Sequence, residues 1–169
     1  LKSDLVKIFF EKDLYDIQKL IASTGVNFKS SSYNIKGKGE TLKFNIKKEE
    51  INVNREKSEL FLEKTKMFSD GNINVDNLAG SFSIEGSNSK LISDTIFITG
   101  FMINGILVNK NGTREISNLE VHDENILSII TEDTEMFSKK AFYDRKKSII
   151  ELFDSVTIKR GSEIITGDY

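Results

Sequence analysis

The sequence of 169 residues contains no cysteine, no proline and no tryptophan, and it has a single histidine. Without cysteine it can form neither a disulfide framework nor a cysteine-based zinc site, and one histidine is too few for a histidine-based metal site. The net charge of −2 gives no reason to expect a nucleic-acid partner. No run of about 18 apolar residues is present that could cross a bilayer as a helix. We therefore expect no metal or other cofactor and no nucleic acid.

The composition that remains is typical of a folded protein. Hydrophobic residues make up 38% of the chain and charged residues 30%, which separates it from disordered sequences of low hydrophobicity. The length allows one domain with a substantial core. Because no linker or low-complexity segment divides the chain, we expect residues 1–169 to form a single domain.

Three stretches of the sequence align with one another without a gap. They span residues 26–37, 75–86 and 156–167, and such self-similarity indicates a repeated structural unit. Each has Val at its start, then Ser six, Ile nine and Gly eleven residues later: Val26, Ser32, Ile35 and Gly37; Val75, Ser81, Ile84 and Gly86; Val156, Ser162, Ile165 and Gly167. Apolar residues two apart on either side of a small, polar turn predict a β-hairpin.

Alternation of apolar and polar residues continues through the rest of the chain, as in a sheet with one wet face. Turn signals recur about every 8–12 residues, which is typical of an all-β sandwich, barrel or roll. Among them, Asp70–Gly71 predicts a two-residue hairpin turn. Residues 5–21 also fit a helical stripe, but their aromatic pair, charged turn and apolar segment recur before the last repeat, which favours strands.

Motifs that could carry chemistry are weak. Ser87 to Lys90 spells S-x-x-K without the companion motifs of the acyl-enzyme families. Asp70 to Asp76 alternates oxygen-bearing residues but lacks the glycine and distal glutamate of a calcium loop. His122 has no partner for catalysis, and the basic cluster 144–147 is better explained as a solvated turn. We therefore expect no enzymatic activity.

The end of the chain resembles a known family. The pattern Tyr143-Asp144, then Val156-Thr157-Ile158, then Ile165-Thr166-Gly167-Asp168-Tyr169 is similar to the OstA-like repeat. This family comprises the periplasmic lipopolysaccharide-transport proteins A and C and the N-terminal domain of transport protein D. The resemblance extends less closely over residues 8–53 and is weak between 87 and 135.

The resemblance implies a single folded-over antiparallel sheet, an open β-jellyroll with an apolar inner face. Family members hold the acyl chains of lipid A in that groove and pass lipopolysaccharide toward the outer membrane. The residues of this chain expected on the lipid-binding inner face are Val26, Phe28, Tyr33, Ile35, Phe82, Ile84, Val156, Ile158 and Ile165. The lysines on the opposite parity, such as Lys29 and Lys159, are expected to face outward.

The resemblance also implies partners and a location. These are lipopolysaccharide, other OstA-like transport proteins joined by edge-strand addition, an inner-membrane ABC transporter complex, and the periplasm. Type A has a cleaved signal peptide and type C an N-terminal membrane anchor. The chain length, sufficient for one roll, slightly favours type C, and type A stays open. The alternative from another class is a structural β-solenoid scaffold or adhesin module, against which the irregular spacing of the repeats argues.

Overall fold

The computed structural model describes residues 1–167, and this part of the chain contains strands and turns but no helix. The strands belong to one antiparallel sheet, and their bounds are β1 (Leu5–Phe10), β2 (Ile17–Ser30), β3 (Ile35–Asn45), β4 (Glu50–Asn54), β5 (Ser58–Leu62), β6 (Thr65–Ser69), β7 (Asn72–Asp76), β8 (Ser81–Ser93), β9 (Ile96–Lys110), β10 (Thr113–Ile130), β11 (Thr134–Asp144), β12 (Ile149–Phe153), β13 (Val156–Arg160) and β14 (Glu163–Gly167). The all-β, antiparallel fold predicted from the alternation is confirmed. Residues 5–21 form β1 and the start of β2, so the strand interpretation of this segment was correct.

The sheet is a meander in which each length of chain folds over on itself. Most of the long strands bend midway, where the pairing register shifts, for example between Ser23 and Val26 in β2 and between Glu85 and Ser89 in β8. Elsewhere the bend interrupts the strand, so that β4 and β5 are two halves of one folded length, as are β6 and β7, and β12 and β13. Bulges of this kind let a sheet curl sharply without losing its partners.

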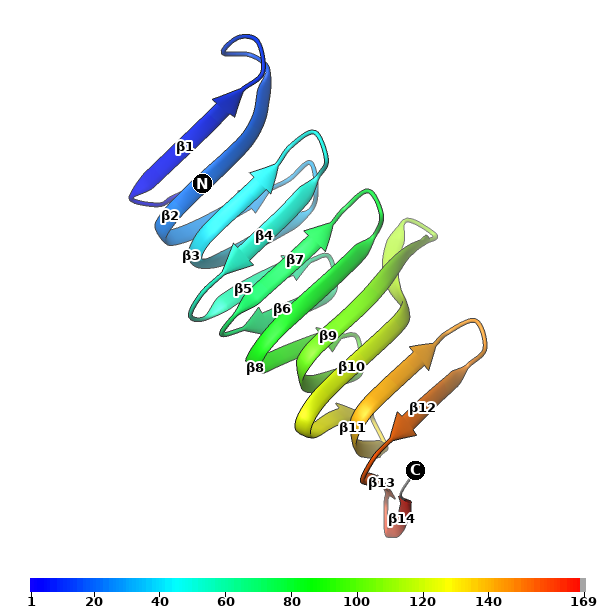
Figure 1. Ribbon diagram of the computed structural model, residues 1–169. Coiled ribbons are helices and arrows are strands. Elements are labelled where there is room, and N and C mark those ends of the chain that lie inside the picture. Colours follow the sequence, from blue (N-terminus) through cyan, green and yellow to red (C-terminus); the bar gives the residue numbers. More distant parts are fainter. Residues whose placement is uncertain (168–169) are drawn as a thin grey trace.

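Folding produces two layers, which we call the front and rear layers. The front layer contains β1, β4, β7, β12 and the halves of the long strands that pair with them; the rear layer contains β5, β6, β13, β14 and the remaining halves. On one side, the fold line, the chain passes from layer to layer. On the other side, the mouth, the layers end in hairpin turns. Figure 1 shows the folded strands following one another along the molecule, with the two termini at opposite ends.

All three repeats form the predicted hairpins, β2–β3, β7–β8 and β13–β14. The first and third lie in the rear layer and the second in the front layer. The glycine that the three repeats share occupies a different structural position in each of them. Gly37 lies within β3, Gly86 lies at the fold line with a φ of 151°, and Gly167 ends β14. The repeat therefore marks a hairpin and not a fixed place in the roll.

Asp70–Gly71 does not form the predicted hairpin turn. It lies at the fold line, where β6 passes into β7, and these two strands pair with different parts of β8. The Asp70 carboxylate accepts hydrogen bonds from the backbone and side-chain amides of Asn88, which tie the corner to β8. A Cβ on Gly71 would lie 2.3 Å from the Glu85 carbonyl oxygen. Neither Asp70 nor Gly71 has a positive φ, so the glycine serves this corner by allowing the close approach of Glu85 and not through the left-handed conformation that a two-residue hairpin uses.

A glycine beneath an aromatic ring offers a test of the packing. A Cβ on Gly105 would lie 2.3 Å from Cζ of Phe82 and 2.9 Å from Cδ2 of Leu119. We predict that Gly105→Ala lowers the unfolding free energy by about 1–3 kcal/mol through overpacking. Combining it with Phe82→Leu should restore part of the loss, giving a favourable coupling energy of about 1 kcal/mol in a double-mutant cycle measured by urea denaturation. Additive effects of the two substitutions would contradict this contact.

Candidate functional site

The candidate site is the space between the layers, toward which one set of side chains points from each layer. The rear layer contributes one cross-strand row that runs through every folded length from β2 to β14: Phe28, Gly37, Leu60, Met67, Leu91, Ile98, Ile129, Met136, Ile158 and Ile165. The front layer contributes another from β1 to β12: Val6, Ala22, Leu42, Val53, Ile73, Ile84, Ile103, Val121, Ala141 and Leu152. Apolar side chains thus line the roll from end to end.

The residues expected on the inner face point into the space between the layers, and both layers contribute to this set. Val26, Phe28, Ile35, Phe82 and Ile84 belong to one buried cluster. Tyr33 and Ile158 pack against that cluster, Val156 is half-buried, and Ile165 is exposed. Phe82 and Ile84 come from the front layer and the others from the rear layer or its turns. Folding of the sheet therefore brings expected lipid-binding residues from the two layers to face the same interior.

Tyr33 differs from the others because it lies at the mouth. It belongs to the turn between β2 and β3 in the rear layer, and its ring meets the ring of Phe44 edge-on, with centroids 5.5 Å apart. Phe44 lies in the half of β3 that pairs with β4, in the front layer. This contact closes the mouth near the N-terminal end of the roll, and edge-to-face pairs add about 0.5–1.5 kcal/mol beyond their burial.

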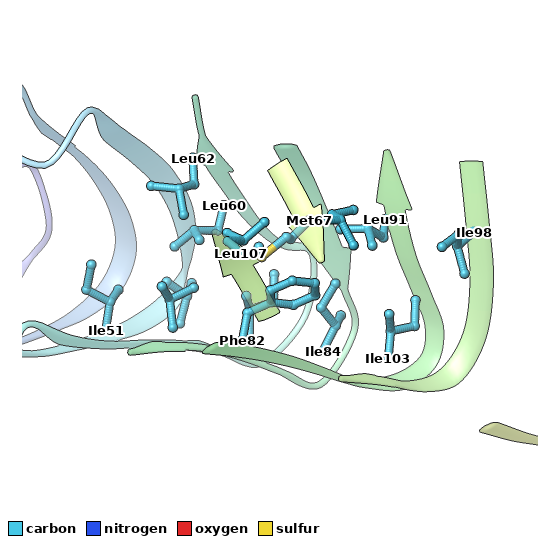
Figure 2. Packing of buried hydrophobic residues seen from close by; sticks show 14 of the residues in the cluster. Ile51, Leu60, Leu62, Met67, Phe82, Ile84, Leu91, Ile98, Ile103 and Leu107 are labelled. Carbon is cyan, nitrogen blue, oxygen red and sulfur yellow. The ribbon is translucent and has the colours of Figure 1, made fainter. Parts of the chain in front are cut away.

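The middle of the roll is filled by its own side chains. Leu60, Met67, Ile73, Ile84 and Ile103 are fully buried, and Figure 2 shows side chains from the two layers pointing toward one another. Burying one such side chain contributes roughly 1.5–3 kcal/mol, so this part is a packed core. Residues of β5 and β6 were not among those expected on the inner face, although the alternation in Leu60–Leu62 contains the signal.

At the two ends of the roll the same inner face is open. Ile8 of β1 faces inward beside Leu20 and is 47% exposed, and Ile165 of β14 faces inward beside Ile158 and is 63% exposed. Within residues 1–167, β1 pairs along its length only with β2, and β14 pairs only with β13. The interior thus ends in apolar side chains that have no neighbouring strand in the described chain to cover them.

The outer face carries charge and amide groups, and lysines cover its aromatic rings. Nζ of Lys36 lies 5.1 Å from the ring centre of Phe61, and Nζ of Lys140 lies 4.7 Å from that of Phe142. A hollow of about 620 Å³ opens on the front layer beside Phe142, where Ile106 and Ile149 adjoin carboxylates and amides. Phe82 is the one residue expected to bind lipid that also lines this hollow.

Other candidate motifs form no site in the described chain. No group of three or more histidine, cysteine or acidic side chains is arranged to hold a metal ion among residues 1–167. The Asp70–Asp76 segment forms the fold-line corner and β7, and its Asn74 donates a hydrogen bond to the Ser83 hydroxyl at 3.1 Å. Residues 1–167 contain no helix that is long and apolar enough to cross a membrane.

Comparison with known proteins adds no family assignment: no protein-family model and no curated protein matches this chain.

One carboxylate near the C-terminal end has a shifted pKa. Asp133 lies in the turn before β11, and the Thr134 hydroxyl donates to its Oδ1 at 2.9 Å. Nε of Arg160, in β13, donates to Oδ2 at 2.9 Å. The Thr134 hydrogen bond and then the hydrogen bond and charge of Arg160 lower the pKa of Asp133 below its ordinary value of 3.8. This exposed pair links the turn to the last hairpin.

The Asp133–Arg160 pair can be tested by titration. Because the folded-state pKa is depressed, the pair stabilises the fold above the ordinary pKa of aspartate, and its contribution is lost as pH falls through the lowered value. We predict that NMR detects Asp133 titrating below 3.8 and that Arg160→Gln moves its pKa upward. The Thr134 hydrogen bond should keep part of the shift. An unchanged Asp133 titration in the Arg160→Gln protein would contradict the contact.

Proposed function

We propose that this chain is a periplasmic carrier of lipopolysaccharide that holds lipid A acyl chains against its apolar inner face, as the resemblance to the OstA-like proteins implies. The observation that carries the proposal is the apolar inner face, which runs the length of the roll and becomes exposed at Ile8 and Ile165. An acyl chain covering these residues would remove apolar surface from water, at roughly 25 cal/mol per Å².

The packed middle determines where a ligand would bind first. Side chains already fill the space around Leu60 and Ile84, so acyl chains are expected to contact the open ends before any deeper part. Carboxylates, lysines and amides dominate the outer face, which makes it a poor surface for hydrocarbon. The inner face at the ends is therefore the favoured place for lipid.

Two neighbouring residues provide a matched test of lipid binding. Ile165 faces inward and is 63% exposed, and Ile164 faces outward and is 64% exposed. We predict that Ile165→Asp weakens binding of purified lipid A at least tenfold, because a charge beside acyl chains costs several kcal/mol unless it is paired. Ile164→Asp should have little effect on binding, because Ile164 faces outward. Both side chains are exposed, so neither substitution should disturb the fold. Binding would be followed by fluorescence titration.

The same pair can be examined in cells that make lipopolysaccharide. Photocrosslinking probes at Ile165 and Ile158 should give lipopolysaccharide adducts, whereas probes at Ile164 and Lys159 should not. Adducts at the outward positions alone would reverse the assignment of faces. If no position gives an adduct and purified lipid A does not bind, the carrier proposal fails.

The two ends are also complementary in shape and in strand direction, which supports edge-strand addition as the way this protein binds its partners. At the N-terminal end the front layer extends one strand further, as β1, and the rear layer ends at β2 with one bridge from Lys2 to Asn27. At the C-terminal end the rear layer extends further, as β14, and the front layer ends at β12. Placed end to end, β1 of one copy would run antiparallel to β12 of the next, and β14 antiparallel to β2. Exposed strand edges of this kind favour such pairing.

Removing β14 tests this joint. Because β14 pairs only with β13 in the described chain, a protein ending at Arg160 should keep its fold, as judged by circular dichroism and urea denaturation. We predict that the full chain associates in a concentration-dependent way in sedimentation analysis and that the shortened protein does not. The Ile164→Asp protein, with β14 intact, serves as the control. Association of the shortened protein at the same strength would exclude β14 from the joint.

A structural scaffold or adhesin module is the second candidate, and the packed middle of the roll favours it because a scaffold needs no space for a ligand. Its β-solenoid form does not fit the antiparallel meander of the described strands. The joint would serve both candidates, so association does not separate them. Lipid A binding that depends on Ile165 would separate the two candidates, because a structural scaffold is not expected to bind lipid at this position.

A further inference from the structure

One hairpin of the roll extends beyond the sheet. The pairing of β8 with β9 ends at Ile106, and that of β11 with β10 ends at Asn118. The two strands β9 and β10 continue past this limit and pair only with each other from Leu107 to Ile116. A shift of register at Ser117 separates this extension from the rest of β10. Residues 107–116, which we call the mouth hairpin, thus form a two-stranded unit at the edge of the front layer.

The mouth hairpin is folded over the interior. Leu107 and Ile116 are cross-strand partners, and both are buried in the same cluster as Leu60 and Phe82. Leu107 appears within this cluster in Figure 2. The neighbouring Val108, on the other face of the hairpin, is 40% exposed. The hairpin therefore presents one apolar face to the core and one face to solvent.

The far side of the hairpin contacts the rear layer. The backbone N–H of Arg114 donates to Oε2 of Glu63 at 2.8 Å, and Nε of the same arginine lies 3.9 Å from Oε1. Glu63 belongs to the turn between β5 and β6, so this contact bridges the mouth. Nη1 of Arg114 is buried without a hydrogen-bond partner. A buried unpaired donor destabilises the closed position, which lowers the free-energy cost of leaving it.

The base of the hairpin is held differently from its far side. The Leu107 N–H donates to the Gly80 carbonyl at 2.7 Å, and the Arg145 N–H donates to the Ser117 carbonyl at 2.9 Å. Arg145 also pairs with Glu115. No further strand pairs beside residues 107–116 in the described chain, and a register shift separates them from the rest of β10. Segments with fewer neighbours open locally at a lower free-energy cost than the rest of the fold.

We propose that the mouth hairpin is a lid. When closed, Leu107 and Ile116 occupy space that the apolar chain of a ligand takes when the lid swings outward about Ser117. The ligand part of this inference rests on the proposed carrier function, and the opening of the lid does not. The lid gives acyl chains a route to the packed middle from the side, beyond the contacts available at the open ends.

Opening is tested without any ligand, by hydrogen exchange read out by mass spectrometry. Residues 107–116 should exchange faster than the adjoining parts of β9 and β10, through a local opening. Glu63→Gln leaves the core intact and removes the bridging charge, so it should accelerate exchange in this segment roughly tenfold. Ile116→Ser should accelerate it further, and Val108→Ser, on the exposed face, should not. Exchange of the segment only through global unfolding, unaffected by Glu63→Gln, would overturn the lid.

Gating is tested with lipid A. The chain has no cysteine, so a Glu63→Cys, Arg114→Cys pair joined by a short bismaleimide reacts at a single place. The joined protein should bind lipid A at least tenfold more weakly than the same protein left unjoined, and Glu63→Gln should bind faster than wild type. Equal binding by joined and unjoined proteins would overturn the lid as the route while leaving the carrier proposal intact. Local opening with no lipid A binding by any variant would support the lid as a moving part and reject the carrier function.

Discussion

The fold follows from one constraint, the need to cover the apolar face of a one-sided sheet. Alternating residues give each strand an apolar and a polar face, and a flat meander of such strands would leave the apolar face in water. Folding the sheet along one line places its two halves face to face, so that Leu60 of the rear layer and Ile84 of the front layer enter one cluster. Bulges make the bend possible because they release a few residues from pairing without ending the strand.

This solution covers the face only where another layer lies opposite. Along the roll each folded length is covered by its neighbours, and burial is complete in the middle. At β1 and β14 no described strand continues the sheet, so both backbone edges and inner-face side chains remain exposed. The same geometry that builds the core therefore produces two apolar ends, where a lipid chain or a further strand would complete what the fold leaves open.

The mouth is the other place where the two layers must meet. Along the fold line the backbone connects the layers, but at the mouth only side chains and turns do so. The Tyr33–Phe44 contact closes one part, and the hairpin that carries Leu107 and Ile116 closes another. A closure made of a few contacts between separate turns is weaker than one made of continuous strands, so movement is easiest there. An interior that is packed at rest and reachable from the side would reconcile a stable core with the carriage of a long apolar molecule.

Much of the fold could be predicted from the sequence because the side-chain period of a strand is local. Val156 and Ile158 share one face whatever their partners are, and the three repeats were recognisable as hairpins from their turn residues. The all-β class and the inward direction of Phe28 followed from the same rule. The resemblance to the OstA-like family, carried by the last repeat, added the expectation of a folded-over sheet.

Other features were decided only by the tertiary structure. Asp70–Gly71 fits a hairpin and a corner equally well, and the choice depends on which distant strands pair with β6 and β7. Ile165 was expected on the inner face from its place in the repeat, but only the tertiary structure shows that the apolar row ends there with Ile165 63% exposed. Leu107 and Ile116 are buried in a cluster with residues distant in the sequence, such as Leu60, and the hairpin that carries them contacts Glu63, about fifty residues away, through Arg114. Alternation by itself determined which face of each strand is apolar; the long-range contacts determined where that face ends and what closes it.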